Sequence, residues 1–169
     1  MYKLFFIPII ILFFACDDGD LQIETLDFNT VDIQMCSTVA ITQNTILFKL
    51  NSDEALILNI APNTLKNEAG TIEIAITATS TSKLIYRLFS AAATKNYFCD
   101  AVPPVSPSVI NEIIASKGNV IITTTVTGTV DAPTYEHQII LDDITFETDN
   151  NQRITDLTIN DFGTITTTN

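Results

Sequence analysis

The chain has 169 residues, of which 46% are hydrophobic, and its 20 acidic and 8 basic residues give a formal net charge of −12. This composition excludes a collagen, a coiled coil, a multi-span membrane protein and a fully disordered chain, and the length suits one domain. The acidic balance disfavours nucleic acid as a partner, because phosphates are bound by Lys and Arg.

The first residues have the pattern of a secretion signal. Lys3 is a short cationic start, and the apolar run from Leu4 to Ala15 ends directly before Cys16. A membrane-spanning helix needs about 17–25 apolar residues and a signal peptide about 7–15, so the run fits the signal peptide. We therefore expect a signal peptide at residues 1–15, an acidic tether at 16–20 and a single domain at 21–169.

Phe13-Phe14-Ala15-Cys16 resembles the lipobox of bacterial lipoproteins, although Phe14 is larger than the residue usual there. The resemblance implies that Cys16 is diacylated on its sulfur and that the new amine is acylated after cleavage. Two or more acyl chains anchor a protein stably. The alternatives are a simple secretory signal with Cys16 as a disulfide partner, and an uncleaved anchor.

Asp17, Asp18 and Asp20 follow the candidate lipid site. The stretch is similar to the one after the lipid-bearing Cys in surface lipoproteins of Bacteroidota, flavobacteria in particular, where the acids signal export to the outer face of the outer membrane. The resemblance implies an outer-membrane lipoprotein that faces the cell surface. The alternative is a solvated, flexible tether, with the domain facing the periplasm.

Strand patterns dominate the rest of the chain. Ile72, Ile74 and Ile76 alternate with polar residues, and Val and Thr alternate over 120–130. About ten short strands with turns between them predict a mainly-β, antiparallel β-sandwich. The predicted strands are 21–28, 31–36, 46–51, 55–60, 71–77, 83–89, 120–130, 135–141, 144–148, 154–160 and 163–167.

One short helix is predicted near residues 107–117. Ser106 suits the N-cap and Pro107 the first helical position, and apolar residues then recur at helical spacing. Lys117 and Gly118 suit the end of a helix.

The register of the C-terminal hairpin follows from its charges. An odd-length turn around Asp149-Asn150-Asn151 pairs Glu147 with Arg153 and Phe146 with Ile154, so the ion pair and the apolar pair lie on opposite faces. An even-length turn would mix the faces. Ile154 and Leu157 are then out of phase, which predicts a bulge near residues 155–156.

Catalytic residues are few. His137 is the single histidine, and it shares a predicted strand face with Tyr135, Ile139 and Leu141. A general base needs a nucleophile within reach and an orienting acid, so we expect a structural histidine and no enzyme. No nucleophile elbow, zinc-binding motif, phosphate loop or dinucleotide fingerprint occurs, and we expect no cofactor.

Two weaker possibilities remain for binding. Asp142-Asp143 and Asp149-Asn150-Asn151 carry oxygen ligands of the kind that Ca²⁺ takes, but neither matches an ordered Ca²⁺ loop, so no metal is predicted. A glycan or small-ligand site would need a concave pocket lined by Tyr86, Tyr97 or Phe98. A hydrolase would need converging carboxylates.

The cysteine count predicts a disulfide. If Cys16 carries lipid, Cys36 and Cys99 remain as an even pair in an oxidising compartment. The alternative is two buried thiols that are too far apart to form a bond.

A second resemblance lies within the predicted domain. Leu84-Ile85-Tyr86-Arg87, Tyr97-Phe98-Cys99-Asp100, Pro103-Pro104 and Pro107 resemble a group of flavobacterial lipoproteins that also open with Cys-Asp-Asp-Gly-Asp and carry a Cys near the first strands. The group implies an envelope lipoprotein and no activity. Some members of that group continue into acidic C-terminal regions.

The sequence therefore predicts a lipid-anchored, non-catalytic envelope domain with an interaction or structural role. It would be attached to the membrane through Cys16, and it would contact a further envelope protein or glycan. The alternatives are a small-ligand or glycan-binding accessory lipoprotein and, third, a hydrolase that uses carboxylates.

Overall fold

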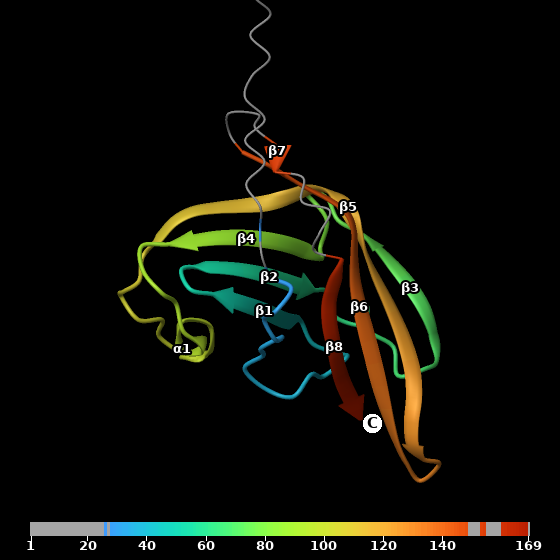
Figure 1. Ribbon diagram of the computed structural model, residues 1–169. Coiled ribbons are helices and arrows are strands. Elements are labelled where there is room, and N and C mark those ends of the chain that lie inside the picture. The colour runs from blue at the N-terminus through green and yellow to red at the C-terminus, as the bar shows by residue number, and fades with distance from the viewer. Residues whose placement is uncertain (1–25, 27, 149–152, 155–159, 169) are drawn as a thin grey trace, which may run out of the picture.

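The computed structural model describes residue 26 and residues 28–148, 153–154 and 160–168. The chain forms one antiparallel, strongly curled sheet whose two halves face each other over the core, a sandwich-like mainly-β fold (Figure 1). The elements are β1 (Thr45–Asn51), β2 (Glu54–Ile60), β3 (Gly70–Ala75), β4 (Lys83–Phe89), α1 (Lys95–Cys99), β5 (Val109–Thr129), β6 (Ala132–Glu147), β7 (Arg153–Ile154) and β8 (Asp161–Thr168).

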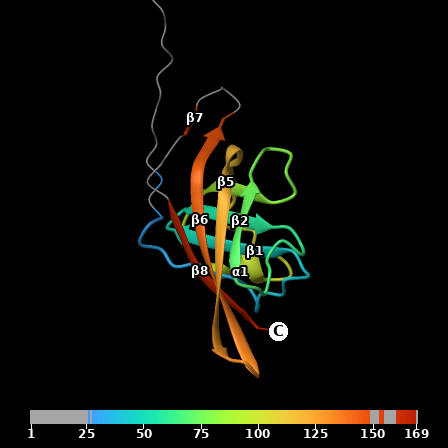
Figure 2. The same ribbon diagram turned by 90° about the vertical axis from the view of Figure 1, so that its right-hand side faces the viewer.

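The long strand β5 joins the two halves. Its first part pairs with β4, which continues the sheet through β2 to β1, and its second part pairs with β3 along the same edge. The other edge of β5 pairs with β6, which carries β7 and β8. Figure 2 shows β5 and β6 as a long ribbon pair that runs down the domain and ends in a projecting hairpin.

β5 turns from one half of the sheet to the other at Gly118. The register between β5 and β6 shifts on both sides of Lys117, and Gly118 has φ of +132°, a conformation that L side chains rarely adopt. Bulges of this kind bend a strand and increase its twist. The bend brings the half of the sheet that contains β3, β6 and β8 over the half that contains β1, β2 and β4.

The main core lies between the two halves of the sheet. It contains the inward residues of every strand, and Leu26 and Phe28 from the start of the described chain are buried in it. A second, smaller cluster lies on the outer face of β1, β2 and β4, where Phe48, Ile57 and Phe89 are covered by the α1 segment. The short helix therefore closes the outer face of one half of the sheet.

The predicted helix near 107–117 is wrong. Residues Val109–Lys117 form the first part of β5, where Ile113 and Ala115 are buried in alternation and Ile113 lies opposite Tyr86 of β4. Val and Ile favour strands, and β4 supplies the hydrogen-bond partners, so pairing overrides the helical spacing. The one helix of the described residues is α1, which the sequence did not indicate.

Several predicted strands occur with changed limits. The strands at 46–51, 55–60, 71–77, 83–89 and 163–167 are found as β1, β2, β3, β4 and β8, and 135–141 and 144–148 form the single strand β6. The segment 31–36 makes only a bridge between Gln34 and Phe48. The predicted strand 21–28 lies almost wholly outside the described residues, as do most of 154–160 and the expected bulge at 155–156.

The predicted register of the C-terminal hairpin is confirmed. Glu147 pairs with Arg153 and Phe146 with Ile154. The Arg153 Nε lies 4.0 Å from the Glu147 Oε1, while Phe146 and Ile154 are both buried on the opposite face.

Candidate functional site

His137 lies at the centre of a buried polar row across three neighbouring strands. Its Nδ1 is 2.8 Å from the Thr124 Oγ1 of β5, and its Nε2 is 2.8 Å from the Thr167 Oγ1 of β8. The Thr167 hydroxyl donates to the Asn67 Oδ1 at 2.6 Å, and the Asn67 amide donates to the Thr168 main-chain oxygen at 3.3 Å. His137 itself has no exposed surface.

The row determines which nitrogen of His137 carries the proton. Because the Thr167 hydroxyl gives its proton to Asn67, its oxygen must accept from His137, which places the imidazole proton on Nε2. The Nδ1 then accepts from the Thr124 hydroxyl. Burial lowers the pKa of His137 from its ordinary value of 6.5, so the neutral ring is favoured.

The row has a hydroxyl beside an imidazole, as in a nucleophile and its general base, but it has no carboxylate to orient the imidazole. The Thr124 hydroxyl is within hydrogen-bond distance of an imidazole nitrogen, but the other nitrogen faces a Thr hydroxyl instead of the carboxylate that would stabilise an imidazolium ion. Thr124 and Thr167 are also buried, at 6% and 3% exposure. The arrangement links β5, β6 and β8 and offers no surface to a substrate.

Lys49 is also buried, with 3% exposure. Its Nζ donates to the main-chain oxygens of Phe28 at 3.0 Å and Asp161 at 3.5 Å, and lies 5.6 Å from the centre of the Phe162 ring. Burial lowers the pKa of Lys49 from its ordinary value of 10.5, while the carboxylates of Asp161 and Asp32 act in the opposite direction. The ammonium group thus links β1 to the start of β8.

An open hollow of about 550 Å³ lies beside Lys49. It is lined by Asn29, Val31, Asp32, Ile33, Lys49, Asp161, Phe162, Gly163 and Thr164. Asp32 and Asp161 also line this hollow, while the Lys49 ammonium group donates to the main-chain oxygens of Phe28 and Asp161. The hollow therefore lies where β1, β8 and the segment that begins the described chain meet.

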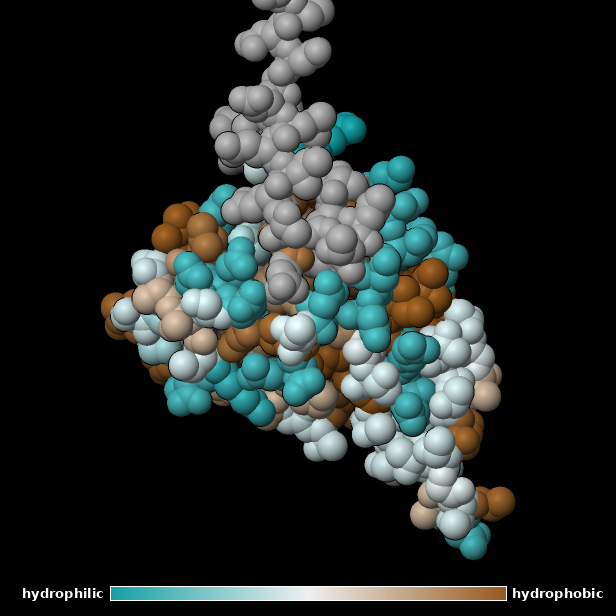
Figure 3. All heavy atoms as spheres, in the orientation of Figure 1, coloured by the Kyte–Doolittle hydropathy of each residue, from teal (hydrophilic) through white to brown (hydrophobic). Residues whose placement is uncertain are grey.

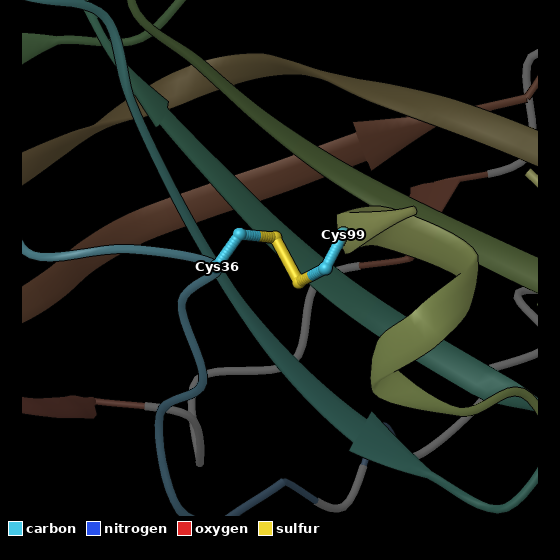
Figure 4. The surroundings of a disulfide bond; sticks show 2 residues. All are labelled: Cys36 and Cys99. Carbon is cyan, nitrogen blue, oxygen red and sulfur yellow. A yellow bond between two sulfur atoms is a disulfide. The ribbon is translucent and has the colours of Figure 1, made fainter. Parts of the chain in front are cut away.

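The Cys36–Cys99 disulfide is formed, as the cysteine count predicts (Figure 4). The two Cα atoms are 5.1 Å apart, and the bond joins the segment before β1 to the last residue of α1. Next to it, the ring of Phe98 stacks on Phe48 at 4.4 Å between centroids, and Tyr97 meets Phe89 edge-on at 4.8 Å. The disulfide therefore holds α1 on the outer aromatic cluster.

The three aromatic residues expected for a ligand site do not come together in one pocket. Tyr86 is buried in the main core, and Tyr97 packs against Phe89. Phe98 lines a hollow of about 250 Å³ beside the disulfide, together with residues from 35–40 and 43–46. This volume is below the range of about 300–1,000 Å³ that is usual for ligand pockets.

The β5–β6 hairpin projects beyond the strands that flank it. β3 pairs with β5 only as far as Thr124, and the last described residue of β8, Thr168, pairs with Thr134. Val126 and Val130 are 50% and 98% exposed on this projection. Figure 3 shows hydrophobic residues at its end, beyond a pale surface formed by residues of intermediate hydropathy.

Threonines account for much of the outer face of this half of the sheet. Across β5, β6 and β8 the register aligns Thr127 with Thr134 and Thr168, and Thr125 with Glu136 and Thr166. A further row aligns Thr123 with Gln138 and Thr164. This face is polar, and Thr123, Thr125, Glu136, Gln138 and Thr164 line a hollow of about 240 Å³ on it.

Several predicted site residues lie outside the described residues, namely Cys16, Asp17, Asp18, Asp20 and the turn at 149–151. Asp142 and Asp143 are exposed on β6, and the described part of the chain contains no cluster of metal-ligating side chains. Sequence reasoning missed Lys49 and the partners of His137. A Lys in the apolar run from 45 to 50 is the one signal that could have indicated a buried cation.

No helix among the described residues has both the length and the apolar character needed to cross a membrane. The chain matches no family model, no curated protein and no solved structure.

Proposed function

We propose that the chain is a lipid-anchored, non-catalytic domain of the cell envelope that acts by contacting another envelope component. In this proposal residues 1–15 are removed, Cys16 carries the lipid, and Asp17, Asp18 and Asp20 direct the protein to the outer face of the outer membrane. The resemblance of the leader and of the acidic stretch to surface lipoproteins of Bacteroidota supports this assignment.

The Cys36–Cys99 disulfide is the observation that best supports a lipid anchor at Cys16. It engages two of the three cysteines of the chain, which leaves Cys16 as the third. A disulfide within the domain also suits the oxidising compartment to which a lipoprotein signal leads.

The environment of His137 supports a non-catalytic role. Both ring nitrogens bond to Thr hydroxyls, and the ring has no exposed surface, so the single histidine of the chain is fully engaged in linking strands.

The orientation of the domain supports contacts at a distance from the membrane. In both ribbon views the described chain starts in the upper part of the domain, coloured blue, and the β5–β6 hairpin ends at the bottom (Figures 1 and 2). An anchor at Cys16 would therefore leave the hairpin on the side away from its entry into the domain.

Membrane fractionation of a Cys16→Ala variant tests the anchor. The variant should move from the membrane to the soluble fraction, because it lacks the acylated side chain. A Cys36→Ala variant, which also loses one cysteine, should stay with the membrane. Retention of Cys16→Ala in the membrane fraction would refute the lipid anchor.

The direction in which the domain faces has a separate test. If the three acids signal export, replacing Asp17, Asp18 and Asp20 together with Ala should preserve acylation but leave the domain inside the outer membrane. Protease added to intact cells should then cleave the wild type and spare the variant. Equal protection of both proteins would place the domain in the periplasm.

A further inference from the structure

Within the described part of the chain, the outer edge of β3 pairs with no other strand. Ile76 donates its N–H to the Gly118 oxygen at 2.8 Å, and the register of β3 on β5 continues from this pair without a shift. Since the direction of hydrogen bonds alternates along an antiparallel strand, Ile72 and Ile74 direct their main-chain groups to β5. Thr71, Glu73 and Ala75 direct theirs outward, away from β5.

Two other outer strands of the sheet, β1 and β8, each receive at least one hydrogen bond from elsewhere in the chain. Gln34 makes two main-chain hydrogen bonds with Phe48 of β1, at 2.7 and 2.9 Å. The Asn67 side chain donates to the main-chain oxygen of Thr168 at the end of β8. Among the residues that the structure describes, β3 pairs with β5 and with no other strand.

The side chains of β3 suit an added strand. Ile72 and Ile74 pack against the main core but are only partly buried, so a neighbouring strand would cover the rest of their surface. Thr71, Glu73 and Ala75 are exposed on the opposite face. Natural proteins usually cover or charge such an edge, and the one charge on β3 is Glu73.

Glu73 disfavours a second copy of the chain as the occupant. Two β3 strands could pair antiparallel about a two-fold axis at Ile72, Glu73 or Ile74. In each of these three registers, at least two outward residues of each strand form main-chain hydrogen bonds with the other strand. The centre on Glu73 sets the two carboxylates directly opposite, at about 5 Å between Cβ atoms, and the other two set them on the diagonal, at about 7–8 Å. Like charges at these positions destabilise the pair, and the chain as a whole carries a formal charge of −12.

We propose that the open edge of β3 binds an extended segment of a partner protein, which adds to the sheet as a strand and carries a Lys or Arg opposite Glu73. The outward N–H and C=O groups of Thr71, Glu73 and Ala75 supply the main-chain bonds, as in other cases of strand addition. β-branched residues of the segment would lie beside Ile72 and Ile74. Glu73 then both repels a second copy and selects a basic partner.

This inference rests on the proposed function, because it names the surface through which the envelope domain makes its contact. The two can fail separately. Membrane fractionation of Cys16→Ala tests the anchor and does not depend on β3, whereas the binding experiment below uses purified mature protein and does not depend on the anchor.

The experiment uses two fluorescently labelled peptides, SGTVKVTGS and SGTVEVTGS, which differ only in the central charge. With the central residue opposite Glu73, the two Val residues lie beside Ile72 and Ile74, and the palindromic core permits parallel or antiparallel addition. In fluorescence anisotropy at low salt, the Lys peptide should bind about five-fold more tightly than the Glu peptide, the ratio expected for opposite against like charges in a cross-strand pair. The substitution Glu73→Lys should reverse the preference.

A proline variant tests the main-chain bonds. Ala75→Pro removes an N–H that points outward and leaves the bonds between β3 and β5, as Pro is tolerated on an edge strand with its nitrogen facing solvent. The variant should lose binding of the Lys peptide and keep its unfolding midpoint. In the free protein the amides of Glu73 and Ala75 should exchange with solvent faster than those of Ile72 and Ile74, and the Lys peptide should slow them.

Three results would overturn the proposal. The first is equal affinity of the wild type for both peptides, or no binding of either. The second is a Glu73→Lys variant that keeps the preference of the wild type. The third is a dimer of the wild type in sedimentation that protects the outward amides of β3, because the occupant would then be a second copy.

Discussion

Gly118 of β5 lies directly against Ile144 of β6: a Cβ at position 118 would stand 2.6 Å from the Ile144 Cδ1 and 2.8 Å from its Cα. The contact lies where β5 turns from one half of the sheet to the other, and Gly118 has φ of +132°. A side chain is therefore opposed at this position by both space and backbone conformation.

Gly118→Ala should lower the free energy of unfolding by about 2–4 kcal/mol, since it combines a strained backbone with an overpacked contact. Urea denaturation monitored by circular dichroism would measure the change. The neighbouring exposed Lys117, replaced by Ala, should change stability by no more than about 0.5 kcal/mol. A neutral Gly118→Ala would mean that the bend of β5 does not depend on glycine.

The Cys36–Cys99 disulfide joins two residues that are 63 positions apart in the sequence. Replacing both cysteines with Ser should lower the free energy of unfolding by around 4 kcal/mol, because the unfolded chain regains conformational entropy. Thiol titration of the unfolded, unreduced protein in a Cys16→Ala background should find no free thiols. Two free thiols would show that the bond does not form.

Buried His137 should make stability depend on pH. Its folded pKa is lowered by burial, so the unfolded state binds the proton first as pH falls below about 6.5. Stability is then fully present above this pH and is lost as the pH falls toward the folded pKa, with a slope of up to about 1.4 kcal/mol per pH unit.

A His137→Gln variant provides the comparison. It should be less stable than the wild type at pH 8, because Thr124 and Thr167 lose partners of the right geometry, and the difference should shrink as pH falls from 7 to 5. Denaturation curves at several pH values would measure both trends. An unchanged difference across this range would indicate that the folded and unfolded states bind this proton equally, so that burial does not lower the pKa of His137.

Buried Lys49 should be sensitive to charge reversal. Lys49→Glu places a carboxylate beside the main-chain oxygens of Phe28 and Asp161 and should lower the free energy of unfolding by about 3–5 kcal/mol. Lys95→Glu makes the same change of net charge at an exposed site and should have an effect within about 0.5 kcal/mol. Equal effects of the two substitutions would mean that net charge, not the contact of Lys49, sets the loss.

The sequence by itself determined the mainly-β class, the positions of several strands, the register of the C-terminal hairpin and the choice of cysteines for the disulfide. These features depend on local patterns: alternation with a period of two, β-branched residues, turn residues and an even count of thiols. The pairing of Glu147 with Arg153 could be derived because the two residues are close in sequence and one register alone keeps charges and apolar residues on separate faces.

Only the tertiary structure decided the features that depend on distant pairing. Val109–Lys117 carries a helical spacing, yet β4 offers it a ladder of hydrogen bonds, and so it became the first part of β5. Lys49 is buried because the segment around Phe28 and the start of β8 bring main-chain oxygens to it from positions far away in the chain. The open edge of β3 is likewise a property of the assembled sheet, since a strand is an edge only when every other strand has found its place.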